Sequence, residues 1–315
     1  RFVALVVLCL LIVGSVLAGA GYSMLGRSLQ APEWVLARFE DRAAEILQGG
    51  TLQVSQANLI VTKDLVPNVQ FRDVVLRDVE GRPLIELADV QATVSRTAAM
   101  RGELELKRLD LSGLIISLKR DEEGEFILAL GQEGRTQQDP LTLAQMIEQL
   151  KELLDQPQFA QLLGLDVQGA TLDYSDAQSG RRWVADGGRI SLSPDADAIR
   201  LRTDFAVLTG PTNVTTLEAS IDVPRGAGRV AIGVNVDDIP ARDIALQSPA
   251  LAWLSVLDAS LSASMRFDLD EDGALGPLFG KLEIAEGALA PEDAIRAIPF
   301  SSARAYFNYD PLQNL

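Results

Sequence analysis

The acidic run DLDEDG, at residues 268–273, is the stretch of this sequence that comes nearest to a metal-binding pattern. Its three aspartates and its glycine match positions one, three, five and six of a calcium-binding loop, which also needs a bidentate Glu at position twelve. Phe279 stands at that twelfth position and has no oxygen to coordinate an ion. We therefore interpret the run as an acidic hairpin turn and expect no metal there.

The other side chains that could do chemistry occur in incomplete combinations. The chain has no histidine, which removes the usual general base and the commonest metal ligand. Its single cysteine, Cys9, lies within an apolar run, so a disulfide or a thiolate cluster within the chain is excluded. Adjacent carboxylates such as Asp237 and Asp238 lie in expected turns, whereas a catalytic pair needs burial to separate its pKa values. We predict a protein that is not an enzyme and that has no cofactor.

The composition favours a protein of many thin strands that does not bind nucleic acid. The net charge of the 315 residues is −16, so the phosphates of a nucleic acid would be repelled. Hydrophobic residues make up 47% of the chain but aromatic residues only 5%, so Leu, Val, Ile and Ala supply the apolar surface.

Residues 2–26 carry no charge, and we interpret residues 1–26 as a transmembrane anchor. As a helix this stretch would be roughly 37 Å long, more than the hydrocarbon core of a bilayer at about 30 Å. Arg1 and Arg27 flank it and could reach the two interfaces. The alternative is a cleaved signal peptide, because residues 18–20 are the small residues AGA. Both interpretations export the rest of the chain.

Two segments read as helices outside the strand-rich parts. A juxtamembrane helix is expected within residues 27–50, with Pro32 in its first turn and Gly49 at its end. It would pack against the next domain or lie on the membrane. An amphipathic helical insertion is expected at 135–164, where apolar residues recur at a spacing of three and four and Pro157 breaks the helix. The insertion would cover an exposed apolar end or contact a partner.

Short alternating strands are expected in a first block, 51–134. Side chains of a strand point to alternate faces, so the parity of the apolar residues reports the face. Leu106 and Leu109 differ in parity, and Ile116 returns to the first parity. Each change of parity requires a bulge, a turn or a new strand.

A second block of strands is expected at 165–315, and we expect it to be truncated at its C-terminal end. The apolar residues alternate cleanly at 199–207, 217–223, 230–236 and 261–269, and a short helix is expected at 248–258. One-sided alternation is typical of an antiparallel sheet with one apolar face.

The fold class predicted is therefore mainly β (α+β): an N-terminal transmembrane helix followed by a long curled antiparallel sheet, with a few capping or inserted helices. Its apolar face must be covered, or remain open as a hydrophobic groove. An open groove would hold acyl chains, since two chains of about 30 methylenes cost on the order of 25 kcal/mol in water. The candidate lipid-binding residues of this groove are Ile116, Leu118, Leu172, Tyr174, Ile199, Leu201, Phe205, Ile232, Val234, Val236, Met265 and Phe267.

Several segments, in their order, resemble the AsmA-like family of Gram-negative envelope proteins, and most closely its YhdP-type branch. They are GRPLIELADVQATVS and RGELELKRLDLSG in the first block, then LGLDVQGATLDYSDAQSGRRWVADGGRISL and ALQSPALAWLSVLDASLSASMRFDLDEDGAL in the second. The resemblance implies a single-pass inner-membrane protein whose bulk lies in the periplasm as a repeating β-groove. It implies a bridge for phospholipid transport toward the outer membrane, with acyl chains, the inner membrane and outer-membrane or periplasmic proteins as partners. The alternative is an envelope scaffold or assembly factor for outer-membrane proteins, without a lipid conduit.

Overall fold

The computed structural model describes thirteen stretches of the chain, and these include most of the two strand-rich blocks. The stretches are residues 28–30, 51–61, 66–77, 81, 83–101, 105–122, 126–130, 143–208, 214–226, 228–245, 249–270, 274–291 and 296–310. The predicted anchor, 1–26, lies outside them, as do residues 31–50 of the predicted juxtamembrane helix and 131–142 around the start of the insertion. Within these stretches, none of the helices combines the length and the apolar character needed to cross a membrane.

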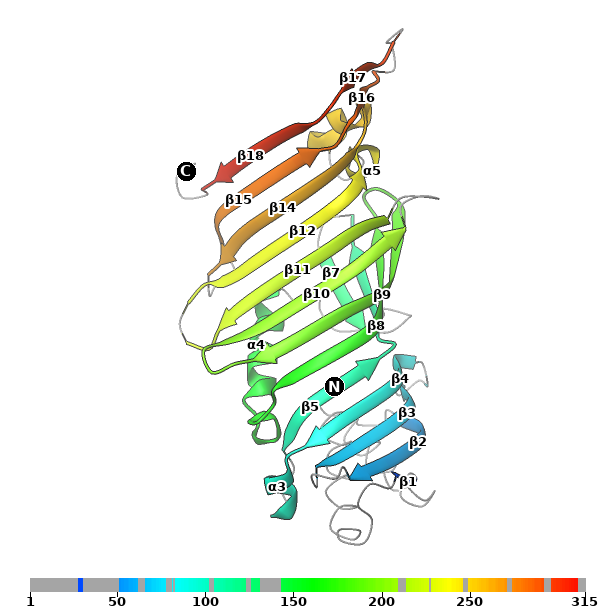
Figure 1. Cartoon of the computed structure of the whole chain (residues 1–315), viewed down its shortest axis with the longest axis vertical. Helices are drawn as coiled ribbons and strands as arrows, with labels where there is room; N and C mark the ends of the chain where they lie inside the picture. Colours follow the sequence, from blue (N-terminus) through cyan, green and yellow to red (C-terminus); the bar gives the residue numbers. More distant parts are fainter. Residues whose placement is uncertain are drawn as a thin grey trace.

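The chain is mainly β, and one large sheet runs through the described residues (Figure 1). This sheet has 15 strands, 13 of them in one continuous order, β1-β2-β3-β4-β5-β8-β9-β10-β11-β12-β14-β15-β18. Its first strands are β1 (Ser28–Gln30), β2 (Thr51–Val61), β3 (Pro67–Arg77), β4 (Pro83–Val94), β5 (Leu106–Ser112), β6 (Ile115–Arg120) and β7 (Phe126–Leu130). The later strands are β8 (Gly164–Asp176), β9 (Arg181–Pro194), β10 (Ala198–Leu208), β11 (Val214–Pro224), β12 (Val230–Pro240), β14 (Ser260–Leu269), β15 (Leu275–Ile284) and β18 (Ala303–Tyr309).

The sheet is mixed, whereas the alternation in the sequence predicted an antiparallel one. β8 pairs in parallel with β5, from Arg108 opposite Gly164, and with β6, from Ile115 opposite Thr171. Parallel neighbours need a long crossover connection, and the chain between β5 and β8 includes the predicted helical insertion. All other strand pairs of the described sheet are antiparallel. The parallel pairing of β8 is possible because the insertion makes the connection long enough for the chain to return in the same direction.

The changes of parity in the first block correspond to irregularities of the backbone, as the sequence predicted. Leu106 and Leu109 are both buried on one face because the register between β4 and β5 shifts between them. Gly113, with a φ of +79°, then ends β5 and allows the chain to start again as β6.

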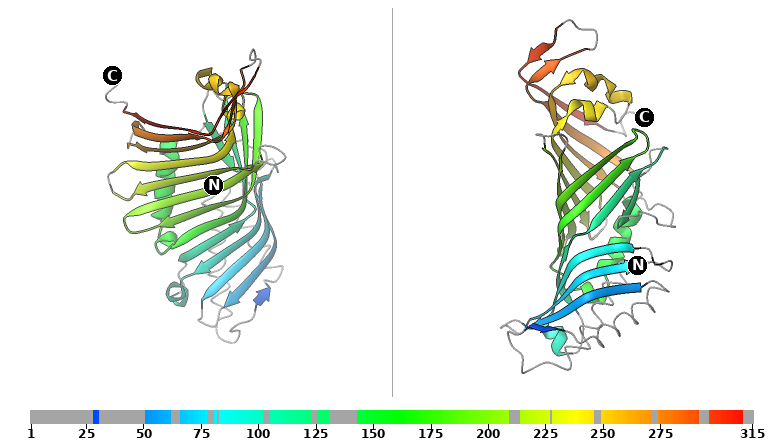
Figure 2. Two further views of the ribbon diagram at one scale, coloured as in Figure 1. Left: turned by 45° about the horizontal axis from the view of Figure 1, so that its top comes forward. Right: turned by 90° about the vertical axis from the view of Figure 1, so that its right-hand side faces the viewer.

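Residues with positive φ form a line across the part of the sheet between β3 and β9. Asp73 on β3 has a φ of +51°, and the equivalent points on β8 and β9 are Gly169, at +62°, and Gly187, at +72°. Gly113 joins them, because its N–H donates to the carbonyl of Gln168 at 3.1 Å. Irregular residues of this kind bend a strand. Figure 2 shows the result: the sheet curves, and one of its faces is concave.

The helical insertion lies on the concave side of the sheet (Figure 2). α4 (Leu143–Leu154) is the described part of the predicted insertion, and the 3-10 turn η1 (Pro157–Phe159) starts at the expected break. Gly164, predicted to end this helix, instead begins β8. The predicted helix at 248–258 is the 3-10 helix η2 (Pro249–Val256), and its last two residues form strand β13 (Leu257–Asp258).

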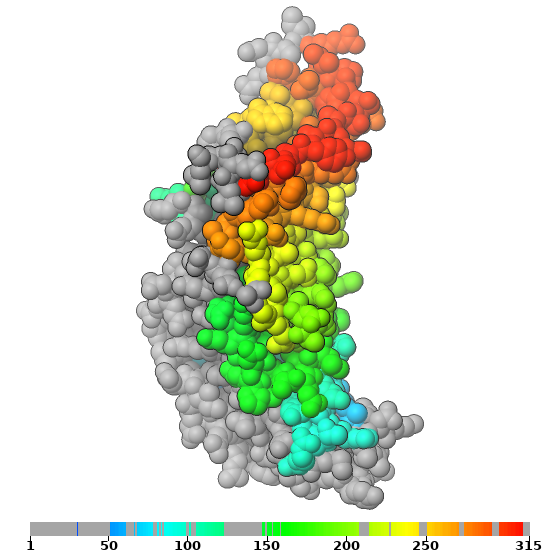
Figure 3. Space-filling view, turned by 90° about the vertical axis from the view of Figure 1, so that its left-hand side faces the viewer, coloured from blue at the N-terminus to red at the C-terminus, as the bar shows by residue number. Residues whose placement is uncertain are grey.

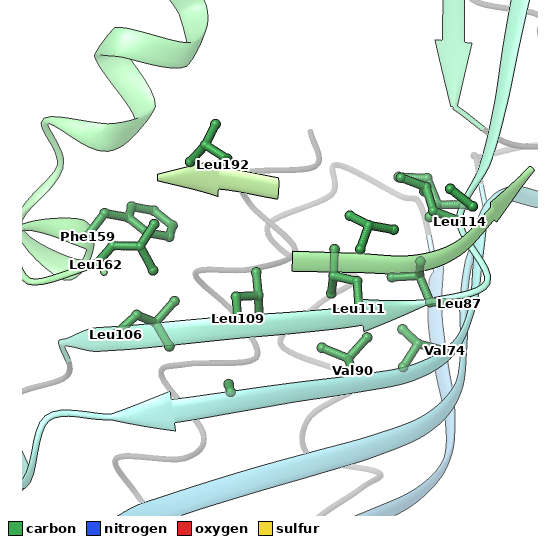
Figure 4. Packing of buried hydrophobic residues seen from close by; sticks show 14 of the residues in the cluster. Val74, Leu87, Val90, Leu106, Leu109, Leu111, Leu114, Phe159, Leu162 and Leu192 are labelled. Atoms are coloured by element: carbon green, nitrogen blue, oxygen red, sulfur yellow. The ribbon is translucent and has the colours of Figure 1, made fainter. Parts of the chain in front are cut away.

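Two apolar clusters hold these layers together. The larger includes Ile147 and Leu154 of α4 together with Leu106 and Leu109 of the sheet. Figure 4 shows Phe159 of η1 and Leu162 on the side of the sheet that carries Leu106. The smaller includes residues of α5 (Ala241–Ala245), η2 and β14. Strands β13, β16 (Gly287–Leu289) and β17 (Ile298–Phe300) form a separate three-stranded sheet, and a short helix α3 (Arg96–Met100) joins β4 to β5.

Candidate apolar binding face

One row of apolar residues crosses the whole sheet, with one residue from each strand of the continuous order. Residues directly opposite each other on paired strands share a face of the sheet. Following these pairs from β1 to β18 gives Leu29, Leu59, Val69, Ala92, Leu109, Leu165, Leu192, Leu201, Ile221, Ile232, Phe267, Leu278 and Tyr309. We call this set the first row.

A second row runs beside the first on the same face, two residues further along each strand. From β2 to β18 its members are Ala57, Phe71, Val90, Leu111, Val167, Ile190, Thr203, Ala219, Val234, Met265, Gly280 and Phe307. Thr203 is the one polar side chain among these members. The two rows together define what we call the inner face.

The opposite face of the same strands, which we call the outer face, is polar and carries ion pairs between neighbouring strands. Arg108 of β5 contacts Asp166 of β8 at 3.3 Å. Arg202 of β10 contacts Asp222 of β11 at 3.6 Å, and Arg200 contacts the same carboxylate at 3.8 Å. The sheet therefore separates an apolar side from a charged side between β5 and β11, whereas toward β18 the outer side also carries the exposed rings of Phe279 and Tyr306.

Burial of the inner face decreases along the sheet. Toward the N-terminal end, the members of the first row from β2 to β5 are covered, and Leu59 and Leu109 are 6% and 3% exposed. Phe267 and Leu278, near the other end, are half-buried, and in β18 Phe307 and Tyr309 are 44% and 47% exposed. Figure 3 shows the strands following one another along the molecule, with β18 in red at the surface. Apolar side chains thus become accessible toward the C-terminal end.

All twelve candidate residues from the sequence lie on the inner face. Ile116 and Leu118 are opposite Leu172 and Tyr174 of β8. The candidates on β10, β12 and β14 belong to the two rows or to the same parity of their strands: Ile199, Leu201, Phe205, Ile232, Val234, Val236, Met265 and Phe267. Ile199, Phe205 and Ile232 are buried and the other nine are half-buried, so the structure brings them together but does not expose them equally.

The sequence did not single out other members of this face. Leu217 and Ile221 of β11 carry the same alternation as the candidates and could have been included. Leu278 and Tyr309 were missed because Gly276, Gly280 and the nearby turns obscure the alternation of β15 and β18.

Aromatic and polar side chains lie together at the C-terminal end of β8 on the inner face. The rings of Tyr174 and Trp183 stack with their centroids 5.4 Å apart. Asp176, whose side chain is fully buried, accepts hydrogen bonds from the backbone N–H of Gln178 and the hydroxyl of Ser179, and lies 4.0 Å from Arg120. Burial is the main reason why the pKa of Tyr174 is raised, and the nearby Asp176 adds to it.

Of the acidic segments predicted as turns, Asp237 and Asp238 instead lie within β12, at an irregularity of its register with β14 where Asp238 has a φ of +58°. At the end of β14, the backbone N–H of Asp270 donates to the carbonyl of Ala274 at 3.0 Å, and the Asp270 carboxylate accepts the N–H of Ala274 at 2.7 Å. Among the described residues no group of three or more acidic, histidine or cysteine side chains is placed to hold a metal ion.

Comparisons of the chain with family models, with curated proteins and with solved structures found no match. The function is therefore inferred from the two faces of the sheet, together with the resemblance of the sequence segments to the AsmA-like family.

Proposed function

We propose that this chain is an anchored lipid-carrying protein of the AsmA-like type, and that its inner face forms a groove for the acyl chains of phospholipids. In this proposal residues 2–26 span the inner membrane and the sheet lies in the periplasm. The protein would then form part of a path for phospholipid between the inner and outer membranes, and its work would be binding rather than catalysis.

The observation that carries the proposal is the unbroken first row. It runs through thirteen neighbouring strands and contains only apolar residues and, at its end, Tyr309. A globular core needs apolar residues to cluster but does not need them to continue to a sheet edge. A path for an acyl chain does need this continuity, because each methylene that leaves apolar surroundings for water costs about 0.8 kcal/mol.

The decrease in burial along the rows also supports the proposal. Half-buried side chains such as Val234, Met265 and Phe267 still present apolar surface to a ligand. Contiguous apolar surface that stays accessible on one face of a protein often marks a binding site. The ion pairs of the outer face give that side no comparable affinity for lipid, so a bound acyl chain would be confined to the inner side.

Two substitutions on neighbouring residues of β12 test the proposal. Val234→Glu places a charge on the inner face, and Asn235→Glu places the same charge on the exposed outer face of the same strand. Lipids that co-purify with the detergent-extracted protein are to be quantified by mass spectrometry. We expect phospholipid with the unmodified protein and with Asn235→Glu, and a loss of most of it with Val234→Glu.

Two results would count against a lipid groove. One is a folded, unmodified protein that carries no lipid after extraction in a mild detergent. The other is equal lipid content in the two variants, each shown by circular dichroism to retain its strands. Either result would favour the scaffold or assembly-factor interpretation.

A further inference from the structure

We propose that the end of β8 and the start of β9 form a subsite for the headgroup of a zwitterionic phospholipid, in which arginine holds the phosphate and aromatic rings hold the ammonium group. The inference rests on the proposed function, because it adds a headgroup site to the acyl groove. Three features carry it: the order of polarity along paired strands, an accessible guanidinium, and a balance of charges beside two stacked rings.

The inner face changes from apolar to aromatic to charged toward the end of β8. Three successive cross-strand rows of β6, β8 and β9 show this change. The rows are Ile116, Leu172 and Ala185, then Leu118, Tyr174 and Trp183, then Arg120, Asp176 and Arg181. Tyr and Trp are enriched where hydrocarbon gives way to headgroups in a bilayer, because each has an apolar body and a polar tip. The rows therefore match the order of groups along a phospholipid.

Arg181 can contact a phosphate without giving up its ion pair. Its Nη1 donates to the carboxylate of Asp243 in α5 at 2.8 Å, and its side chain is still 38% exposed. A guanidinium has five N–H donors, and this hydrogen bond uses one of them. Planar guanidinium groups bind phosphate oxygens through paired hydrogen bonds. Arg181 thus still presents donors to a phosphate on the inner face.

The groups beside Arg181 are held in position by the protein itself. The guanidinium of Arg120 lies 4.0 Å from the buried carboxylate of Asp176 and donates a hydrogen bond to the hydroxyl of Tyr174. The ring of Tyr174 in turn stacks on that of Trp183. Side chains that are already ordered lose less conformational entropy when a ligand binds. The site is therefore formed before the headgroup arrives.

The charges and the rings together favour a headgroup that carries both signs. The cluster contains two cations and two anions: Arg120, Arg181, Asp176 and Asp243. Its net charge is zero, so it does not attract anions in general. The half-buried rings of Tyr174 and Trp183 lie beside these charges, and the face of an aromatic ring attracts an ammonium group. A phosphate joined to an ammonium group satisfies both the guanidinium and the rings, whereas an anionic headgroup satisfies the guanidinium alone.

The apolar rows beside the site assign it to a lipid rather than to a free phosphoester. Acyl chains that extend from a headgroup at Arg181 would continue over Leu118 and Leu172 on the inner face. Each methylene that leaves water there adds about 0.8 kcal/mol of affinity. A water-soluble phosphoester has no such contribution.

The test uses the full chain, extracted in a mild detergent, and vesicles of dioleoylphosphatidylcholine and dioleoylphosphatidylglycerol in equal amounts with a smaller fraction of dioleoylglycerol. The three lipids have the same acyl chains and differ only in the headgroup. After incubation the protein is re-isolated, and its lipids are quantified by mass spectrometry relative to the vesicles. We expect phosphatidylcholine to be enriched roughly threefold over phosphatidylglycerol. Both phospholipids should be enriched roughly tenfold over dioleoylglycerol.

Two variants separate the two parts of the headgroup. Trp183→Leu should abolish the preference for phosphatidylcholine over phosphatidylglycerol, and Arg181→Gln should reduce the preference for phospholipid over dioleoylglycerol. Arg182→Gln is the matched control, because it removes the same charge from the adjacent residue, which lies on the outer face and pairs with Asp173. It should change neither ratio. Circular dichroism of each variant checks that its strands are retained.

The outcomes distinguish the headgroup site from the acyl groove. Bound lipid without enrichment, or ratios that Trp183→Leu and Arg181→Gln leave unchanged, would overturn the headgroup site and leave the groove supported. Equal changes of the ratios in Arg182→Gln would also overturn the site. Absence of all lipid would overturn both. Soluble phosphocholine, added in an amount equal to the lipid, should displace none of it, and displacement would overturn the assignment to a lipid in favour of a free phosphoester.

Discussion

The aromatic ring of Phe205 lies directly over the backbone of Gly188, so closely that a Cβ on this glycine would be 2.2 Å from two ring carbons. Phe205 belongs to β10 and Gly188 to the neighbouring β9, at a point where the register between the two strands shifts. The same arrangement recurs at the other end of the inner face, where the ring of Phe307 covers Gly280. In both places an aromatic ring fills the space that a glycine leaves on the apolar side of the sheet.

Substitution of Gly188 by Ala should destabilise the protein by about 1–3 kcal/mol, the usual cost of overpacking a core. Urea unfolding followed by circular dichroism gives this difference. In the background of Phe205→Ala, where the ring is absent, the same glycine substitution should cost much less. Equal costs in the two backgrounds would mean that the ring and the glycine are not coupled.

The bend of the sheet should depend on the left-handed conformation of its glycines. No atom lies within 4 Å of a Cβ built on Gly169, so Gly169→Ala would create no clash, but its φ of +62° costs a residue with a side chain about 1–2 kcal/mol. Gly169→Asn should cost less, because Asn tolerates this region better. Gly226→Ala, with similar free space and without a positive φ, is the control and should be nearly neutral. Equal midpoints of thermal unfolding for Gly169→Ala and Gly226→Ala would contradict this account.

Because burial decreases along the first row, the same Leu→Ala substitution should destabilise the protein more at one end of the row than at the other. Leu109→Ala, at a position 3% exposed, should destabilise the protein by about 2–5 kcal/mol. Leu278→Ala, in a half-buried position of the same row, should cost less than about 1.5 kcal/mol, because less apolar surface is removed from contact. Chemical unfolding of both variants measures the two costs. A larger cost at Leu278 would show that the row is covered equally along its length.

Asp110 predicts a dependence of stability on pH. Burial raises the pKa of its carboxyl; Arg108 opposes this shift, and Asp166, directly opposite on β8, adds to it. A folded-state pKa above the unfolded value means that ionisation disfavours the fold, so this contribution to stability is lost as the pH rises through the folded pKa. Asp110→Asn should therefore be more stable than the unmodified protein at pH 7, by less than about 1 kcal/mol because the side chain is partly solvated. The difference should shrink below pH ~4, near the ordinary pKa of Asp. A difference that does not change with pH would contradict this explanation.

The positions of the strands and of the inner-face residues follow from local alternation, which is why the sequence could predict them. Val234 and Met265 both lie on the inner face because the apolar residues of each strand alternate with polar ones. This alternation can be read within each strand, without knowing which strands pair. The parallel junction at β5, β6 and β8 could not be predicted in this way, because it depends on which distant strands pair. The degree of burial was equally inaccessible, since it depends on the layers that pack on each strand: Leu109 belongs to the larger apolar cluster, whereas Leu278 is half-buried.

Because each strand pairs with the next in a regular order, the number of strands sets the length of the sheet. Adjacent strands lie about 4.8 Å apart, so the thirteen strands from β1 to β18 extend over roughly 60 Å. Adding or deleting one antiparallel hairpin changes this reach by about 10 Å and leaves the order of every remaining neighbour intact. A molecule of this design can thus be fitted to a given distance by counting strands, without redesign of its interior.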